Sequence, residues 1–191
     1  EADALPSGTT FTLIPEMGSR HPQVAQMSAP LEQGQVPDDF QDMTQQLEKK
    51  LAPVLRRFDN VIVHNIFTKH FNLPLTAARH HLLDSGAIHH CIAWCHDFTW
   101  SSPHSRSKVH PGYPWDLLRT QRPDVTYVVV SKRRQRTLAG LLDCSPEEIR
   151  VVYNGVDPRT LLGLSIEGHK LVNRLGILES DLILLDRKST R

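Results

Sequence analysis

Apolar residues along the chain gather in short runs that are separated by longer, amphipathic segments. Six of the runs are largely continuous and rich in β-branched residues, a pattern typical of strands buried on both faces of a sheet. These runs cover residues 11–15, 61–67, 91–95, 125–130, 149–153 and 182–185. Strands that alternate with helices predict an α/β protein. We expect a Rossmann-like, doubly wound and mostly parallel sheet with helices on both faces.

The segments between the runs carry apolar residues at three- and four-residue spacing, which indicates helices that bury one face. The longest of them covers residues 43–58, although Pro53 should bend or restart the helix. Another covers about residues 75–83 and ends before Gly86, because glycine commonly closes helices. A third predicted helix follows Ser131, a favourable N-cap residue.

An Asn-Gly pair, Asn154-Gly155, stands at the end of a strand-like run in the segment RVVYNGVD, residues 150–157. Such a pair between two alternating runs indicates a hairpin, because both residues tolerate positive φ. Here, however, Asp157-Pro158 follows, with aspartate as a helix N-cap and proline at the first helical position. The sequence therefore predicts a turn that joins a strand to a helix.

Composition narrows the class of protein. The 191 residues are 39% hydrophobic and 23% charged, as in ordinary soluble globular proteins, and no apolar run is long enough to span a bilayer. The net charge of +1 provides no general basic field, so we expect no nucleic-acid partner. Three cysteines form no even disulfide framework and indicate a reducing compartment.

Polar residues follow four of the predicted strands at their carboxyl ends. In an open parallel sheet, ligands bind in the crevice outside this edge. The rule selects four pairs as the candidate site: His64-Asn65, His96-Asp97, Ser131-Lys132 and Asn154-Gly155.

The segments around these pairs resemble the N-terminal, acceptor-side domain of family 4 glycosyltransferases, which are retaining enzymes of the GT-B fold. The resemblance is carried by VIVHN (61–65), IAWCHDFTW (92–100), YVVVSKRRQR (127–136) and RVVYNGVD (150–157), in family order. It implies that the parent protein moves a sugar from a nucleotide-sugar donor to a saccharide, lipid-linked or small-molecule acceptor. It also implies that no cofactor or essential metal is needed, and that the enzyme works in the cytoplasm or beside the inner face of a membrane.

The chain departs from the family pattern at both ends. It begins without methionine and opens with a polar segment where the family has a strand and a Gly-rich loop. The family's C-terminal GT-B domain supplies most nucleotide contacts, and here its pattern stops after one strand. We therefore expect residues 1–180 to form an incomplete N-terminal domain. Residues 181–191 would be the first strand of a truncated second domain plus the tail DRKSTR, and the fragment alone would be inactive.

The resemblance implies a role for each strand-end residue. His96 matches a histidine that hydrogen-bonds a hydroxyl of the donor sugar, a task that suits a neutral imidazole with one donor and one acceptor. Asp97 either orients His96 or binds the acceptor. A histidine that caps a strand and an aspartate that stabilises a turn are the structural alternatives. His64 and Asn65 either face the cleft or are buried and bonded to backbone.

The remaining site candidates lie within the second, third and fourth of these motifs. Lys132, Arg133, Arg134 and Arg136 follow Ser131 into the first turn of a predicted helix, where free N–H groups could bind a phosphate; a solvated basic helix face is the alternative. Of these residues, Ser131, Lys132 and Arg136 are assigned to the donor- or acceptor-binding set. Trp100 belongs to the same set of donor- or acceptor-binding residues. Asn154 and Gly155 would be the linker turn at the interdomain cleft.

Two rival functions remain open at this stage. The first is a nucleotide-binding Rossmann-like module without transferase activity; no G-x-G-x-x-G motif follows a predicted strand, but a mononucleotide site is compatible with the pattern. The second is a zinc-dependent hydrolase, because nine of the eleven histidines lie between His64 and His110. Against it, Cys91 and Cys95 would stand more than about 12 Å apart along one strand, too far to bind one ion.

Overall fold

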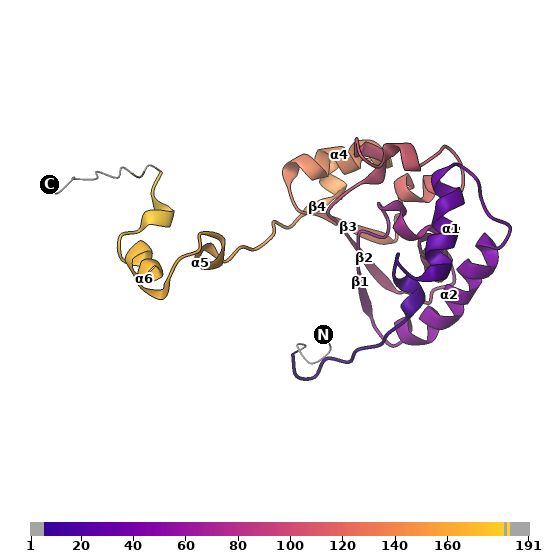
Figure 1. The fold of residues 1–191 in the computed structure, drawn as a ribbon, viewed down its shortest axis with the longest axis horizontal. Helices are drawn as coiled ribbons and strands as arrows, with labels where there is room; N and C mark the ends of the chain where they lie inside the picture. Colours follow the sequence, from indigo (N-terminus) through magenta and orange to yellow (C-terminus); the bar gives the residue numbers. More distant parts are fainter. Residues whose placement is uncertain (1–5, 182, 184–191) are drawn as a thin grey trace. The chain divides into compact units, whose positions relative to one another are not determined.

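The computed structural model describes residues 6–181 and residue 183 (Figure 1). The chain divides into two compact units, residues 1–153 and 154–191. The first unit contains a four-stranded, all-parallel sheet in the order β1-β2-β3-β4, which confirms the α/β, Rossmann-like class. The strands are β1 (Asn60–His64), β2 (His90–Cys95), β3 (Val125–Val129) and β4 (Arg150–Val151).

Helices precede and connect these strands. The α-helices are α1 (Pro22–Glu32), α2 (Phe40–Leu55), α3 (Leu73–Asp84) and α4 (Lys132–Leu142) in the first unit, and α5 (Pro158–Leu161) and α6 (Ile166–Arg174) in the second. Short 3-10 turns complete the described elements: η2 (Pro15–Met17), η3 (His70–Asn72), η4 (Thr99–Ser101), η5 (Arg106–Lys108), η6 (Trp115–Arg119), η7 (Pro146–Glu148) and η8 (Ile177–Glu179). None of the described helices is both long and apolar enough to cross a membrane.

Local sequence signals account for several helix ends. The hydroxyl of Ser131 accepts the backbone N–H of Arg134 at 3.2 Å, so the predicted N-cap of α4 is confirmed. Gly86 takes a φ of +67° just after α3, where side chains are strongly disfavoured. Pro53 lies inside α2 and neither bends it into two helices nor restarts it, because the helix ends two residues later at Leu55.

Two strand predictions differ from the structure, and a third is not tested by it. Residues 11–15 contain no strand: residues 9–14 have no regular structure, and a 3-10 turn begins at Pro15. The predicted strand at residues 149–153 is reduced to the two residues of β4. The prediction for residues 182–185 lies almost entirely outside the described residues, as does the tail after Asp181.

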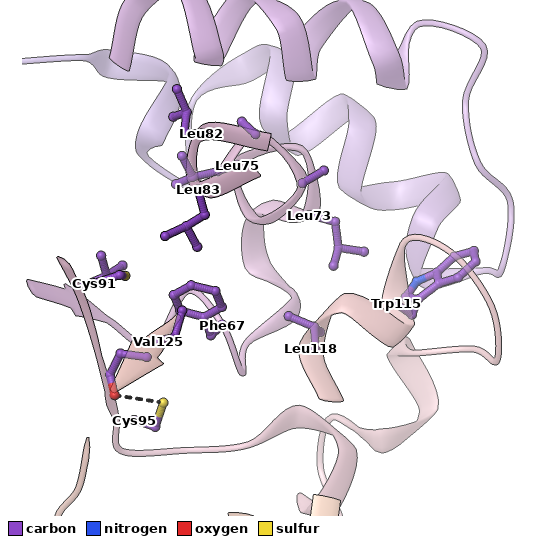
Figure 2. Packing of buried hydrophobic residues seen from close by; sticks show 14 of the residues in the cluster. Phe67, Leu73, Leu75, Leu82, Leu83, Cys91, Cys95, Trp115, Leu118 and Val125 are labelled. Carbon is purple, nitrogen blue, oxygen red and sulfur yellow. Dashed lines mark hydrogen bonds between the residues drawn. The ribbon is translucent and has the colours of Figure 1, made fainter. Parts of the chain in front are cut away.

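The core lies between α3 and the sheet. Leu75, Leu82 and Leu83 of α3 and Phe67 are all buried and face the sheet residues Cys91, Cys95 and Val125 (Figure 2). Helix α2 packs in turn against α3. This packing holds β1 and β2 in fixed register, with His64 opposite Trp94, and so fixes the positions of the residues that follow the strands.

The alternate residues of β1 and β2 are far less covered. In β2, Ile92 and Trp94 are half-buried, whereas the residues that alternate with them, Cys91, Ala93 and Cys95, are buried. In β1, Ile62 is 54% exposed. Side chains of successive strand residues point to opposite faces of a sheet. One face of the sheet near β1 is therefore open among the described residues.

Candidate functional site

The carboxyl ends of β1 and β2 are joined by the side chain of Asn65. Its amide oxygen accepts the backbone N–H of His96 at 2.8 Å and that of Asp97 at 3.3 Å. Asn65 also has a φ of +59°, a conformation that asparagine tolerates better than other side chains. The structure therefore brings together two of the four predicted pairs, and Asn65 acts there as a structural link.

The imidazoles of His64 and His96 stack at this edge. Their ring centroids are 5.9 Å apart with an interplanar angle of 24°, and His64 stacks on Trp94 at the same separation. His64 is exposed and His96 half-buried. The three flat rings form a partly exposed row, which offers ring nitrogens for hydrogen bonds and apolar faces for packing.

Asp97 contacts the start of α4. Its carboxylate pairs with the guanidinium of Arg134 at 2.7 Å, and its backbone carbonyl accepts the hydroxyl of Thr68 at 2.7 Å. Arg134 belongs to the basic run after Ser131, and no sequence pattern distinguishes it from its neighbours there. Because Asp97 is 53% exposed and Arg134 39% exposed, water and salt weaken this ion pair.

A basic hollow of about 260 Å³ lies beside the first turns of α4. It is lined by Ser101, Arg133, Arg134 and Thr137. The predicted anion ligands Lys132 and Arg136 are exposed but do not line it. At this helix start, the hollow therefore selects Arg133 and Arg134 as the cations placed to hold an anion.

A second hollow, of about 170 Å³, adjoins the end of β1. Its wall includes His64, Asn65, Lys69 and Phe71, and the Lys69 ammonium lies 4.8 Å from the centre of the Phe71 ring. Lys69 and Phe71 were not among the predicted site residues. Their only sequence signal was their position shortly after the VIVHN segment.

Trp100 has a different position from the other candidates. It is 4% exposed, and its indole N–H donates to the carbonyl of Trp115 at 3.2 Å. The guanidinium groups of Arg106 and Arg119 lie 4.8 Å and 4.1 Å from the centre of its ring. Trp100 therefore pins the loop after β2 and presents no free ring face for a sugar.

The fourth predicted pair, Asn154 and Gly155, begins the second unit. Both residues are exposed and lie between β4 and α5, so the segment joins a strand to a helix as predicted. Neither residue has a positive φ, however, so the tight Asn-Gly turn is absent and the segment is an open connection.

The histidines between His64 and His110 do not gather into a metal-binding group. Among the described residues, no group of three or more His, Cys, Asp and Glu side chains is placed to hold a metal ion. Cys91 and Cys95 are both buried, and burial raises the pKa of Cys95 to about 12, so its thiol stays protonated at neutral pH.

No protein-family model, curated protein or solved structure matches this chain.

Proposed function

We propose that this chain belongs to the acceptor-side domain of a retaining glycosyltransferase that uses a nucleotide-sugar donor. One observation carries the proposal: the Asn65 link places His64, His96 and Asp97 side by side at the carboxyl edge of a parallel sheet. Ligands of open α/β sheets bind at this edge. The residues gathered here are those that the resemblance assigns to substrate.

His96 has the chemistry needed to position a sugar. A neutral imidazole can donate one hydrogen bond and accept another, and so can bind a hydroxyl in one orientation. The exposed ring of His64 stacks beside it at an interplanar angle of 24° and provides a flat surface for the C–H face of a saccharide. We assign donor-sugar positioning to His96 and assign His64 to the wall beside it.

The basic hollow at α4 suits a diphosphate. Arg133 and Arg134 line it, and Ser131 opens the helix immediately before them. Helix N-termini and arginine side chains both stabilise phosphate oxygens. During transfer, negative charge develops on the diphosphate leaving group, and preorganised donors lower the barrier by stabilising that charge.

The resemblance supplies the rest of the proposal. A second GT-B domain would bind most of the nucleotide, the acceptor would be a saccharide, a lipid-linked sugar or a small molecule, and the parent enzyme would be cytoplasmic or bound to the inner face of a membrane. We expect no metal or cofactor requirement, and we expect these 191 residues alone to catalyse no transfer.

The direct test is a titration of isotope-labelled chain with UDP-glucose, GDP-mannose, UDP, GDP and pyrophosphate, followed by NMR. We expect weak binding, roughly millimolar, with signals of His64, His96 and Asp97 shifted by the nucleotide-sugars more than by the free nucleotides. His96→Ala should remove about tenfold of the affinity that the sugar adds. His90→Ala is the matched control, since His90 is an exposed histidine at the opposite end of β2.

Other results would favour the rival function. If nucleotides and nucleotide-sugars bound equally well, and His96→Ala changed neither, a mononucleotide-binding module would replace the transferase. In an intact parent enzyme, recovered by reading the source DNA past residues 1 and 191, His96→Ala should lower kcat/KM about tenfold to a hundredfold. If His96→Ala left transfer by the parent enzyme unchanged, the assignment of His96 to the site would be wrong.

A further inference from the structure

His70 is a buried histidine that has no role in the function proposed above. It lies in η3, is 5% exposed, and contacts two other elements of the first unit. Its ring Nδ1 lies 2.9 Å from the hydroxyl oxygen of Thr99 in η4, and its backbone N–H donates to the same oxygen at 3.2 Å. Its Nε2 makes no hydrogen bond among the described residues and lies 3.5 Å from a carboxylate oxygen of Glu32 at the end of α1.

The hydrogen bonds of Thr99 assign the tautomer of the His70 ring. The Thr99 hydroxyl accepts the backbone N–H of His70, and in the part of the chain that the structure describes its own hydrogen has no acceptor other than Nδ1 of that ring. Because Thr99 is fully buried, an unpaired hydroxyl there would be costly. The hydroxyl therefore donates to Nδ1, and the neutral ring carries its proton on Nε2, which faces Glu32.

Thr99 connects His70 to the candidate site in two ways. Its backbone N–H donates to the carbonyl of Thr68 at 2.9 Å, and the Thr68 hydroxyl donates to the carbonyl of Asp97 at 2.7 Å. Thr99 also begins η4, the turn that ends at Ser101, and Ser101 lines the basic hollow. Thr68 and Thr99 are both buried, so water does not compete for these contacts.

Protonation of His70 would disturb this arrangement. An imidazolium carries a hydrogen on both nitrogens, so Nδ1 could no longer accept from Thr99, and the buried hydroxyl would lose its acceptor. The charged groups around the ring are Glu32 in α1, Lys108 in η5 and the neighbouring Lys69. Burial lowers the pKa of His70 below its usual 6.5, Glu32 opposes this shift and the two lysines add to it. The ring is therefore neutral at pH 7.5 and takes up its proton in acid.

We propose that His70 is a positioning residue for the basic hollow, because its neutral ring fixes the hydroxyl of Thr99. Through Thr99 the ring sets the position of Ser101 in the wall of the hollow and of Asp97 beside it. This inference rests on the proposed function, in which the hollow holds the diphosphate. His70 itself touches no substrate and acts only through the turn that Thr99 begins.

An NMR titration of the labelled full chain from pH 8 to pH 4.5, without ligand, tests the coupling. The amide signals of Thr68 and Ser101 should shift with the same midpoint as the His70 ring. His70→Asn places an amide oxygen near the position of Nδ1, so it can accept from Thr99 but cannot titrate, and it should abolish that midpoint. His81→Asn is the matched control and should leave the midpoint unchanged, since His81 also pairs with a glutamate but lies 39% exposed on α3.

Calorimetric titration with pyrophosphate at pH 7.5 tests the effect on binding. Thr99→Val removes the hydroxyl and keeps the branched shape of the side chain, so it should raise the pyrophosphate Kd about threefold to tenfold. Thr99→Ser keeps the hydroxyl and should raise the Kd less than about twofold. His70→Asn should bind as Thr99→Ser does, because it restores the acceptor; if Thr99→Val fails to fold, the shared NMR midpoint and its loss in His70→Asn decide the question.

The outcomes separate this inference from the proposed function. If the wild-type chain does not bind pyrophosphate at millimolar concentrations, the hollow is not an anion site, and the diphosphate assignment is wrong together with the role of His70. If the wild type binds but Thr99→Val binds as tightly as Thr99→Ser, only the positioning role is wrong. Signals of Thr68 and Ser101 that ignore the His70 midpoint, or keep it in His70→Asn, also overturn the positioning role alone.

Discussion

The side-chain oxygen of Asn65 accepts the backbone N–H of His96 at 2.8 Å, although the two residues are 31 positions apart. This single side chain fixes the end of β1 to the end of β2. The same hydrogen bond orients the backbone of His96 just after β2, and so determines where the imidazole of His96 can contact a ligand.

Substitutions at Asn65 should separate the contribution of its hydrogen-bonding side chain from that of its positive backbone φ. Asn65→Ala loses the acceptor and places an alanine at a φ of +59°, so we expect it to lower the free energy of unfolding by about 2–4 kcal/mol. Asn65→Gly loses the acceptor but relieves the backbone strain, and should cost about 1–2 kcal/mol. Urea denaturation measures both. Equal losses for alanine and glycine would mean that the backbone conformation contributes nothing.

The ion pair of Asp97 with Arg134 should regulate anion binding more than stability. Removing the carboxylate with Asp97→Asn frees Arg134, which lines the basic hollow, so we expect pyrophosphate to bind roughly threefold to tenfold more tightly at low salt. Asp143→Asn makes the same change of charge at the far end of α4 and serves as the control. Calorimetric titration measures both, and equal gains would point to net charge alone.

Acid should destabilise the fold through His80. Burial lowers the pKa of His80 to about 4, with Arg122 and Arg79 adding to the effect, against 6.5 in an unfolded chain. Below pH 6.5 the unfolded state therefore takes up a proton that the folded state refuses until about pH 4. Above pH 6.5 His80 is neutral in both states and costs no stability. As the pH drops from 6.5 to 4, His80 lowers the free energy of unfolding by about 3 kcal/mol.

The control for this pH dependence is His80→Gln, which cannot titrate. Its free energy of unfolding, measured in urea from pH 7.5 to 4, should fall less steeply than that of the wild type. Part of the slope should remain, because burial also lowers the pKa of His70. Identical slopes in variant and wild type would show that His80 does not carry the effect.

Arg79 is a buried cation without a carboxylate partner among the described residues. It is 3% exposed, and its neighbours are the ring of Phe67 at 4.1 Å and the sulfur of Cys91 at 3.5 Å. Burial lowers the pKa of Arg79 to about 10. We expect Arg79→Met, measured by urea denaturation in dilute solution, to be neutral or stabilising by about 1–2 kcal/mol, because it removes the cost of burying a charge.

A matched truncation completes this test. Arg79→Ala leaves a cavity and should destabilise by about 3 kcal/mol. If methionine proved as damaging as alanine, the guanidinium would be better compensated by Phe67 and Cys91 than its contacts indicate.

The sequence by itself determined the parts of the fold that depend on local pattern. Continuous apolar runs located β1, β2 and β3, although only alternate residues of β1 and β2 are buried, whereas such runs predict burial on both faces of the sheet. The N-cap at Ser131 was equally readable, since a cap forms between residues three apart. The alternation of these elements was enough to predict a parallel sheet, and the carboxyl-edge rule then selected His64, Asn65, His96 and Asp97.

Tertiary structure decided everything that depends on a distant partner. Residues 11–15 have the composition of a strand but form none, because a strand needs a neighbour to pair with and composition supplies no neighbour. Trp100 could have faced a ligand, yet packing turned it inward against Trp115. The contact of Asp97 with Arg134 joins residues 37 positions apart. No local pattern encodes such contacts, because only the folded chain brings their partners within reach.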